Sequence, residues 1–357
     1  MINITQTEEI YTEVLAADIC LPVGNQTKPG LKGSSHCSLF EMTKFSGMIE
    51  YTPSEYVFTA YGGTKLGEVE AILGDHGQFL PFDPPFIQQG ATLGGTIAAG
   101  LSGSGRYRYG GLRDFILGVR YVDGQGRAIR AGGKVVKNAA GFDIPKLMVG
   151  SLGQFGAILE VSFKVFPKPI AYQTIYRVYP TIKEATEAII KLSLAHIDLF
   201  CIDLVPGDGK FTLYVRIGGD PKIFPERSAR LSSMLGEGII LSESDEQKLW
   251  VSTREFTWVP EGSNLVKVPI TPNKLSELDG YLDGQHSLRR YAVGGNLAWV
   301  GWDDPLEELS QKLLELKLPG LVILGRSEHP RIGFRTGEVF EARVKKALDP
   351  TGRWMEV

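Results

Sequence analysis

The spacing of apolar side chains predicts a mixed α+β protein. Residues 157–166 (AILEVSFKVF) alternate between apolar and polar positions, the pattern of a half-buried antiparallel strand. Residues 64–73 instead repeat apolar side chains at helical spacing, with Gly74 placed to end the helix. Helical spacing also marks residues 1–16 and a short segment at 94–100. Strands rich in β-branched and aromatic residues are predicted at 18–23, 48–51, 56–60, 116–122 and 128–131.

The pattern resets after Pro167-Lys168-Pro169, where we expect the main domain boundary. Beyond it, strands are predicted at 174–179, 199–204, 210–217, 265–270 and 321–324, and helices at 181–194, 222–235 and 336–348. We therefore expect a first domain of residues 1–169, a smaller α+β domain of residues 170–330, and a segment of residues 331–357 whose helix returns to the first domain.

Composition and charge are those of an ordinary globular protein. With 357 residues, 43% hydrophobic and 22% charged, the chain is long enough for two domains. A net charge of −3 argues against a general nucleic-acid binder, which would carry a basic face. No apolar run approaches the roughly 18 residues of a membrane span, and the N-terminus lacks the basic and apolar regions of a signal peptide. We expect a cytoplasmic protein.

Three widely spaced cysteines, Cys20, Cys37 and Cys201, cannot supply the roughly four thiolates of an iron–sulfur cluster, and they disfavour a structural zinc site. We interpret them as reduced, buried small side chains and expect no metal site. Any redox chemistry therefore needs an organic cofactor or a partner that carries the electrons.

Residues 90–111 (GATLGGTIAAGLSGSGRYRYGG) contain eight glycines among aliphatic side chains. Glycine is costly in ordered structure, so this density indicates close backbone approach or positive φ at several positions. We interpret the segment as a wall of backbone N–H groups facing a phosphate-bearing cofactor. The usual fingerprints, G-x-G-x-x-G and G-x-x-x-x-G-K-[ST], are absent, so the phosphate site is of another kind.

A second candidate for that site is the loop of residues 23–28 (VGNQTK), which follows a predicted strand. Gly24 and Asn25 tolerate positive φ, which turns successive N–H groups toward an anion, and Thr27 and Lys28 add a hydroxyl and a charge. An ordinary surface turn is the alternative interpretation.

Taken in order, several motifs resemble the FAD-binding domain of vanillyl-alcohol-oxidase and para-cresol-methylhydroxylase (PCMH) type flavoproteins. They are P22-V-G-N-Q-T27, G47-M-I-E-Y-T-P53, L80-P-F-D-P-P85 leading into G90-A-T-L-G-G95, R113-D-F-I-L-G-V119, K137-N-A-A-G-F-D143 and G150-S-L-G-Q-F-G156. Within that superfamily the chain is most similar to the FAD-binding subunits of glycolate oxidase (GlcE-like), in length and in the closing phrase A-L-D-P-T-G.

The resemblance implies a two-lobed PCMH-type FAD-binding domain, followed by the smaller α+β cap domain and the C-terminal helix. By that mapping, residues 23–28 hold the pyrophosphate, residues 90–100 run along the ribityl chain and the isoalloxazine, and residues 156–158 complete the far wall. Many relatives attach the flavin to a histidine where this chain has Gln26, so we expect non-covalent FAD and a plain polar role for His36. The expected cofactor-binding residues are Val23, Gly24, Asn25, Gln26, Thr27, Lys28, Pro81, Gly90, Ala91, Thr92, Gly94, Gly95, Ala98, Gly100, Gly156 and Ile158.

The family implies oxidation of glycolate to glyoxylate by a complex in which this subunit is an accessory electron-transfer flavoprotein. Its partners would be a catalytic flavin subunit and an iron–sulfur subunit, which could hold it peripherally at the inner membrane. Catalytic relatives carry late histidines in an E-H-G-type phrase, whereas this chain has Ser327-Glu328-His329-Pro330. No catalytic residue is therefore assigned. The alternatives are a self-sufficient FAD-dependent 2-hydroxy-acid (D-lactate-type) dehydrogenase and a scaffold that no longer holds flavin.

Structural roles are predicted for several residues outside the expected cofactor site. Asp83 either bonds the cofactor or caps a turn, and Arg113-Asp114 are expected to form a structural ion pair. Arg289-Arg290 are expected on a solvated face, with an acid-recognising pair as the alternative. Helix-cap or loop roles are expected for Lys137, Asn138 and Asp143, and core or interface positions for Trp299 and Trp302.

Overall fold

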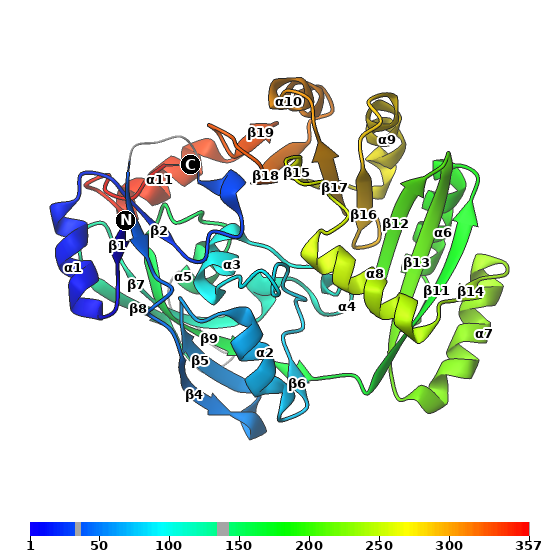
Figure 1. Ribbon diagram of the computed structural model, residues 1–357, viewed down its shortest axis with the longest axis horizontal. Coiled ribbons are helices and arrows are strands. Elements are labelled where there is room, and N and C mark those ends of the chain that lie inside the picture. The colour runs from blue at the N-terminus through cyan, green and yellow to red at the C-terminus, as the bar shows by residue number, and fades with distance from the viewer. Residues whose placement is uncertain (33–36, 134–142, 357) are drawn as a thin grey trace. The chain divides into compact units, whose positions relative to one another are not determined.

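The computed structural model describes residues 1–32, 37–133 and 143–356, which form two compact units (Figure 1). The first unit comprises Met1–Ser102, Gly110–Lys168 and Thr336–Val357, and the second comprises Gly103–Tyr109 and Pro169–Arg335. The division after Lys168 falls within the Pro-Lys-Pro segment. Two assignments differ from the expected domains, because residues 103–109 of the glycine-rich segment and residues 331–335 belong to the second unit.

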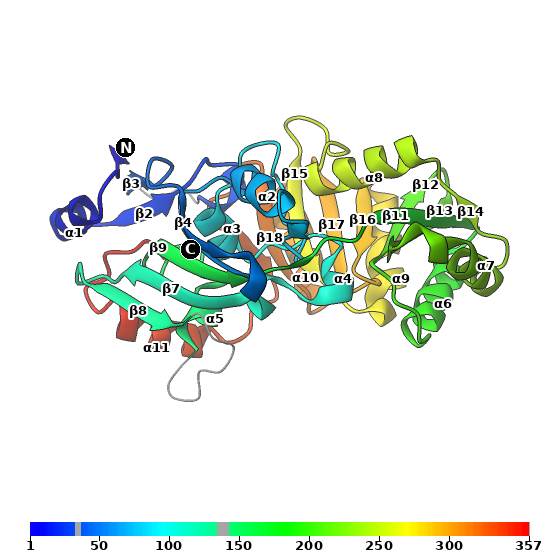
Figure 2. The ribbon, with the colours of Figure 1, turned by 90° about the horizontal axis from the view of Figure 1, so that it is seen from below.

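A five-stranded antiparallel sheet forms the larger layer of the first unit (Figure 2). Its order is β4 (Met48–Thr52), β5 (Val57–Tyr61), β9 (Ala157–Lys164), β7 (Ile116–Val122) and β8 (Ala128–Gly132). The central strand β9 is more buried than the expected half-buried strand, because Ile158 and Ser162, on the face opposite Leu159 and Val161, are only 7% and 9% exposed. The hydroxyl of Ser162 is hydrogen-bonded to that of Thr59 at 2.8 Å, which removes the cost of burying either one.

A second, parallel sheet carries the N-terminus. It contains β1 (Ile2–Asn3), β3 (Ser38–Glu41) and β2 (Cys20–Val23) in that spatial order, and a third pairing joins β6 (Gln78–Phe79) to β10 (Phe166–Pro167). Residues 2–3, expected to be helical, are thus a strand. The helices of this unit are α1 (Thr7–Ala16), α2 (Leu66–Gly74), α3 (Leu93–Ala99), α5 (Ile144–Met148) and α11 (Glu338–Leu348).

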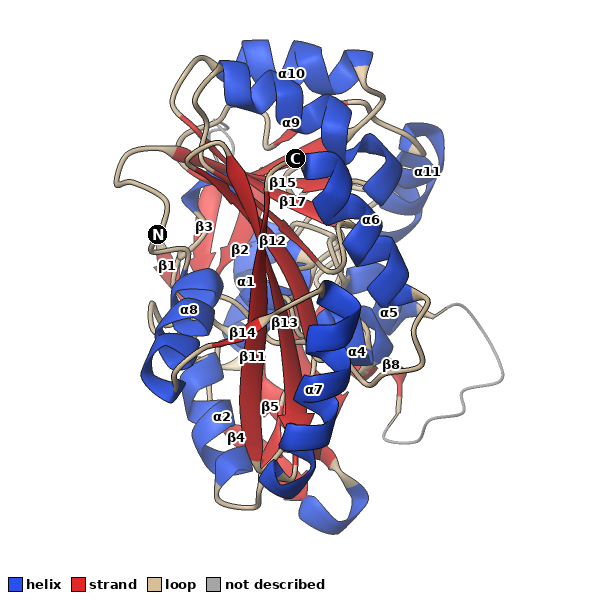
Figure 3. Cartoon of the chain, turned by 90° about the vertical axis from the view of Figure 1, so that its right-hand side faces the viewer, coloured by secondary structure: helices blue, strands red, loops and turns tan. Residues whose placement is uncertain are grey.

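The second unit is built on a nine-stranded antiparallel sheet (Figure 3). Its order is β14 (Ile239–Ile240), β11 (Ala171–Tyr179), β13 (Lys210–Gly219), β12 (Cys201–Gly207), β16 (Arg289–Ala292), β17 (Leu297–Trp302), β15 (Asn264–Pro269), β18 (Pro319–Leu324) and β19 (Arg331–Gly333). The predicted mixed α+β class is therefore confirmed in both units.

Helices cover both faces of the nine-stranded sheet. One face packs against α6 (Ile182–Ser193), α7 (Phe224–Leu235), α9 (Leu275–Gly284) and α10 (Leu306–Glu315), whose buried leucine, isoleucine and alanine side chains join one apolar core with the strands. Helix α8 (Glu243–Glu255) lies on the opposite face (Figures 2 and 3), and the short α4 (Arg106–Tyr109) also belongs to this unit. Trp302 is fully buried in the core and Trp299 is 3% exposed, which agrees with their expected core positions.

The Arg289-Arg290 pair is not a solvated face, so that prediction is wrong. The Arg289 guanidinium is buried and forms ion pairs with Asp279 at 2.6 Å and Asp283 at 2.9 Å. Burial opposes the charge, but hydrogen bonds from Arg289 to the two carboxylates outweigh it and raise the pKa of Arg289. Arg290 donates to the Thr253 hydroxyl at 2.7 Å, and burial lowers its pKa. Sequence could not show these contacts, because Asp279 lies on α9, which was not predicted.

Candidate functional site

A pocket in the first unit lies between the end of β2, the start of α3 and the turn that precedes β9. Its lining is dominated by glycine and small side chains, and a carboxylate is not among them. The lining residues are Pro22, Val23, Gly24, Met42, Gly62, Thr92, Gly94, Gly95, Ala98, Gly153, Gly156 and Ile158.

Three backbone segments meet at this pocket through short hydrogen bonds. Gly94 N–H donates to the carbonyl of Gly62 at 2.7 Å, and Gly62 N–H donates to the carbonyl of Leu159 at 2.7 Å. A Cβ added at Gly94 would lie 3.0 Å from the Gly62 oxygen, and one added at Gly62 would lie 2.5 Å from the Ile158 oxygen. Only glycine allows this approach without displacing backbone.

The glycine-rich segment therefore does not act as the expected wall of free N–H groups. The amides of Gly90 and Gly94 donate to protein carbonyls, and the amide of Gly95 donates to the Thr92 hydroxyl at 3.3 Å, which caps α3. Gly100 ends α3 in the left-handed conformation (φ +62°). The glycines instead bring the backbone of α3 against β9 and residue 62, and these close backbone contacts form part of the pocket wall.

The loop of residues 23–28 packs on the neighbouring loop of residues 86–90. The Asn25 side chain donates to the Gln89 carbonyl at 3.0 Å, and the Lys28 ammonium lies 5.7 Å from the centre of the Phe86 ring. Positive φ occurs at Gln26 (φ +50°), not at Gly24 or Asn25 as expected. The glycine at position 24 is needed for space, because a Cβ there would lie 2.1 Å from the Thr92 hydroxyl oxygen.

Lys28 is a cation without an anionic partner. Its ammonium donates to the Thr27 hydroxyl at 3.0 Å, and no carboxylate of the described residues pairs with it. Burial lowers the pKa of Lys28 to about 8. A partly buried cation of this kind is stabilised by a bound anion.

Of the sixteen residues expected to bind the cofactor, the structure brings eight together around the pocket. Five others, at positions 25–28 and 90, lie on the two packed loops beside it, whereas Pro81, Ala91 and Gly100 are not part of the lining. Sequence reasoning missed Pro22, Met42, Gly62 and Gly153. The Gly62-Gly63 doublet directly after a predicted strand was a usable signal for close backbone approach.

Other expected residues have separate outcomes. Asp114 does not form the predicted ion pair with Arg113; its carboxylate accepts from the Gly111 N–H at 2.8 Å, and both side chains are exposed. Asp143 caps α5 by accepting from the Lys146 N–H at 3.3 Å, as predicted. Asp83 is half-buried at φ +53°.

Three of the residues with a predicted role, His36, Lys137 and Asn138, lie outside the described residues.

The cysteines differ in burial. Cys20 and Cys201 are buried, whereas Cys37 is only half-buried, contrary to expectation. In the part of the chain that the structure describes, no three or more histidine, cysteine, aspartate or glutamate side chains are grouped to hold a metal ion. Within the same residues, no helix has the length and apolar character needed to cross a membrane.

Comparison with known families identifies the class of domain that supplies nine of the twelve residues lining this pocket. Residues 4–132 match the FAD binding domain family, which confirms the predicted FAD-binding domain and its cofactor. A solved structure of alkyldihydroxyacetonephosphate synthase superposes with a TM-score of 0.70 at 15% identity, covering 98% of this chain and 74% of that one. At that identity the likeness shows the fold alone.

Curated relatives are similar over part of the chain. Glycolate oxidase subunit GlcE of Escherichia coli is 44% identical over 176 residues, covering 47% of this chain and 50% of that protein. Glycolate oxidase subunit GlcD of Bacillus subtilis is 36% identical over 150 residues, covering 42% and 32% respectively. The mitochondrial cytochrome D-lactate dehydrogenase of Arabidopsis thaliana is 30% identical over 138 residues, covering 39% and 24%. The chain thus spans half or less of the length of these relatives.

Proposed function

We propose that this chain is the FAD-binding subunit of a glycolate oxidase complex that converts glycolate to glyoxylate. In that complex it holds FAD non-covalently and passes electrons beside a catalytic flavin subunit and an iron–sulfur subunit. The observation that carries the proposal is the glycine-lined pocket, formed by the motif residues of an FAD binding domain in a chain 44% identical to a glycolate oxidase subunit over the matched region. We place the protein in the cytoplasm, with any membrane association made through partners.

The residues at the pocket fit a dinucleotide with a flat ring and a diphosphate. At Gly62, Gly94 and Gly156 the backbone packs directly against neighbouring backbone, so the pocket is lined by main chain, against which a planar group can lie. Lys28, which is half-buried and paired with no carboxylate of the described residues, supplies positive charge for a diphosphate on the adjoining loop. Gln26, which is exposed on this loop, has no nucleophilic atom that could attach the flavin.

When bound, FAD supplies hydride and single-electron transfer that no side chain can perform. The chain's own residues bind and orient it: Thr92 fixes the start of α3, Asn25 ties the two loops together, and Lys28 neutralises charge. The apolar side chains of Val23, Met42 and Ile158 would exclude water from the pocket.

The accessory role is favoured because, among the described residues, no titratable side chain that could act as a base for substrate lines the pocket. Oxidation of a 2-hydroxy acid needs a group that removes the hydroxyl proton, most often a histidine. None of the four described histidines, His76, His196, His286 and His329, lines the pocket, and the His329 side chain is exposed. The second candidate, a self-sufficient D-lactate-type dehydrogenase, rests on the similarity to D-lactate dehydrogenase and requires a base elsewhere.

Three measurements test the proposal. The purified protein should be yellow or become so with added FAD, and acid precipitation should release all flavin into the supernatant. Glycolate and D-lactate added to the isolated protein should leave the flavin absorbance unchanged. The tagged chain, purified from its source cells, should bring down a second flavoprotein and iron in stoichiometric amounts.

Each outcome separates the candidates. Bleaching of the isolated flavin by either acid would favour the self-sufficient dehydrogenase. A protein that stays colourless with excess FAD would refute flavin binding altogether.

A further inference from the structure

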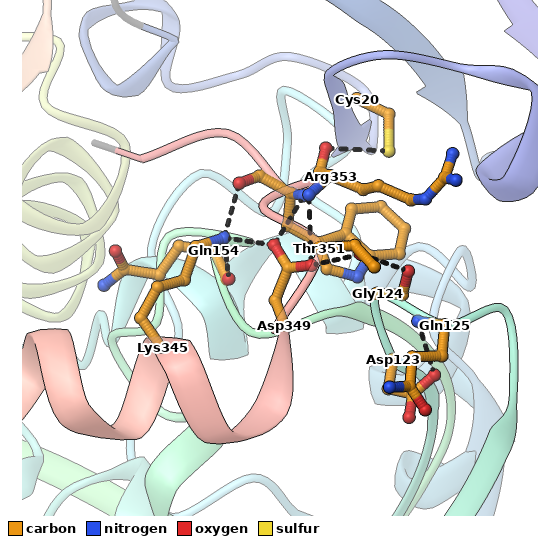
Figure 4. Close-up of polar contacts among 10 residues, drawn as sticks. Cys20, Asp123, Gly124, Gln125, Gln154, Lys345, Asp349, Thr351 and Arg353 are labelled. Atoms are coloured by element: carbon orange, nitrogen blue, oxygen red, sulfur yellow. Dashed lines mark hydrogen bonds and ion pairs between the residues drawn. The ribbon is translucent and has the colours of Figure 1, made fainter.

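The C-terminal segment of the first unit contacts two of the chain segments that line the cofactor pocket. Helix α11 and residues 349–355 lie against β2 on one side and against the turn of residues 151–156 on the other (Figure 4). A group of hydrogen bonds centred on Lys345 and Asp349 joins these contacts. We call residues 345–355 the C-terminal clamp.

The first contact of the clamp is with β2. Cys20 N–H donates to the Arg353 carbonyl at 2.7 Å, and Met355 N–H donates to the Cys20 carbonyl at 3.0 Å, so the clamp extends this strand by a parallel bridge. Pro22, Val23 and Gly24, which line the pocket, follow two to four residues later. The position of the clamp therefore sets the position of this pocket wall.

The second contact is with the turn before β9. The Lys345 ammonium, on a side chain only 7% exposed, donates to the carbonyl of Gln154 at 2.9 Å. Gln154 stands between Gly153 and Gly156, both of which line the pocket. The Gln154 amide also donates to Glu341 of α11. One buried lysine thus ties α11 to the second wall.

Asp349 connects the two contacts. Its carboxylate, fully buried, accepts from the Lys345 ammonium, from Trp354 N–H at 2.8 Å and from Arg353 N–H at 3.0 Å. The Thr351 hydroxyl donates to the Gly124 carbonyl at 2.8 Å and lies 3.2 Å from the same carboxylate, which is an alternative acceptor for its single hydrogen. A buried ion pair is stable only when its remaining donors and acceptors are satisfied, and here they are.

We propose that Lys345 and Asp349 are positioning residues for the cofactor, and that docking of the C-terminal clamp and binding of FAD are thermodynamically coupled. This inference rests on the proposed function, because it assumes that the pocket holds FAD. Both pocket walls, the end of β2 and the turn of residues 151–156, are hydrogen-bonded to the clamp, which the Lys345–Asp349 ion pair holds together. Releasing the clamp therefore removes these contacts from both walls. Coupling is reciprocal, so FAD in turn holds the clamp in place.

The first test compares FAD affinity with stability. Lys345→Met leaves Asp349 buried without its cation, while Lys346→Met removes an exposed charge one position along the same helix and serves as the matched control. Couplings between sites typically change affinity by about 5- to 150-fold. We expect the Kd for FAD to rise within that range for Lys345→Met and Asp349→Asn, and to stay at the wild-type value for Lys346→Met.

A general loss of stability must be separated from loss of positioning. Arg289→Met breaks a buried ion pair of the second unit and serves as the destabilised reference. At a temperature where each variant is fully folded by circular dichroism, it should bind FAD as the wild type does. An unchanged Kd in Lys345→Met, or an equal loss in Arg289→Met, would overturn the coupling.

The second test needs no variant and stands even if Lys345→Met fails to fold. Hydrogen exchange at the amides of Trp354 and Met355 is followed in wild-type protein with and without FAD. We expect FAD to slow exchange there more than at strand β14 of the second unit. If FAD binds but exchange at Trp354 and Met355 is as fast with FAD as without it, the coupling is refuted and the proposed function stands. If the wild-type protein binds no FAD, both are refuted.

Discussion

A matched pair of glycine substitutions tests whether backbone approach at the pocket is what the glycines provide. Gly94 and Gly67 each occupy the second position of a helix, α3 and α2 respectively, with negative φ. Replacing either by alanine restricts the unfolded chain and favours the helix by about 0.4–1 kcal/mol. The two sites differ only in what the new methyl group meets.

The structure sets the size of the difference. At Gly67 the methyl carbon would lie 3.7 Å from an Ile87 methyl group, an ordinary contact, so Gly67→Ala should stabilise the protein. At Gly94 it would lie 3.0 Å from the Gly62 oxygen and 3.3 Å from two other Gly62 backbone atoms, which are themselves held by hydrogen bonds. Overpacking of this kind costs about 1–3 kcal/mol, so Gly94→Ala should be less stable than Gly67→Ala by that amount.

Thermal unfolding and FAD titration measure the two consequences. For a unit of this size about 1 kcal/mol corresponds to about 2–4 °C in Tm, so the two variants should differ by at least about 2 °C. The Kd for FAD should rise about tenfold in Gly94→Ala, equivalent to a loss of about 1.4 kcal/mol, because the displaced carbonyl lines the pocket. The reasoning is refuted if Gly94→Ala raises Tm as Gly67→Ala does and binds FAD with the wild-type Kd.

Three further predictions concern charged and reactive groups. Burial lowers the pKa of Lys28 to about 8, so the affinity for FAD should fall between pH 7 and pH 9 as the amine loses its proton. Lys28→Met should bind FAD weakly at every pH. The same dependence of affinity on pH in the wild type and in Lys28→Met would contradict the role of Lys28. Arg289→Met leaves Asp279 buried without its cation and should lower the free energy of unfolding, measured in urea, by about 3–5 kcal/mol. Adding Asp279→Leu should recover part of this loss. If it recovers none, the unpaired charge is not the cause. Burial raises the pKa of Cys20 to about 12, so iodoacetamide at pH 8 should modify half-buried Cys37 first and Cys20 only on unfolding. Mass spectrometry measures the two modification rates, and equal rates at Cys20 and Cys37 would contradict the burial of Cys20.

Local pattern predicted much of the first unit. The alternation in residues 157–166 corresponds to β9, and the strands predicted at 116–122 and 128–131 correspond to the β7–β8 hairpin, because side-chain periodicity and β-branched or aromatic composition specify these elements. In the second unit, β17 (LAWVGW) is buried on both faces and shows no alternation, so nothing marked it as a strand. Helix α8 carries mostly polar side chains and was missed for the opposite reason.

The sequence predicted which chain segments lie at the pocket, but not the contacts that these segments make there. The motifs at 23–28, 90–100 and 156–158 lie at or beside it, yet the hydrogen-bond partners of their amides could not be inferred. Gly94 donates to Gly62, more than thirty residues away, and Lys345 reaches Gln154 across most of the chain. Such pairings depend on the folded path of the chain, which the spacing of residue types does not record.

The order of chain segments in the two units has a consequence for biosynthesis. Domains usually fold as they leave the ribosome, N-terminal domain first. Here the last segment of the first unit, Thr336–Val357, is made only after the whole of the second unit has been translated. At about 5–20 residues per second, translation of everything after Lys168 takes roughly ten to forty seconds. During that interval β2 lacks its hydrogen bonds with Arg353 and Met355, so the strand that leads into the pocket is held on that side only after the last residues are made.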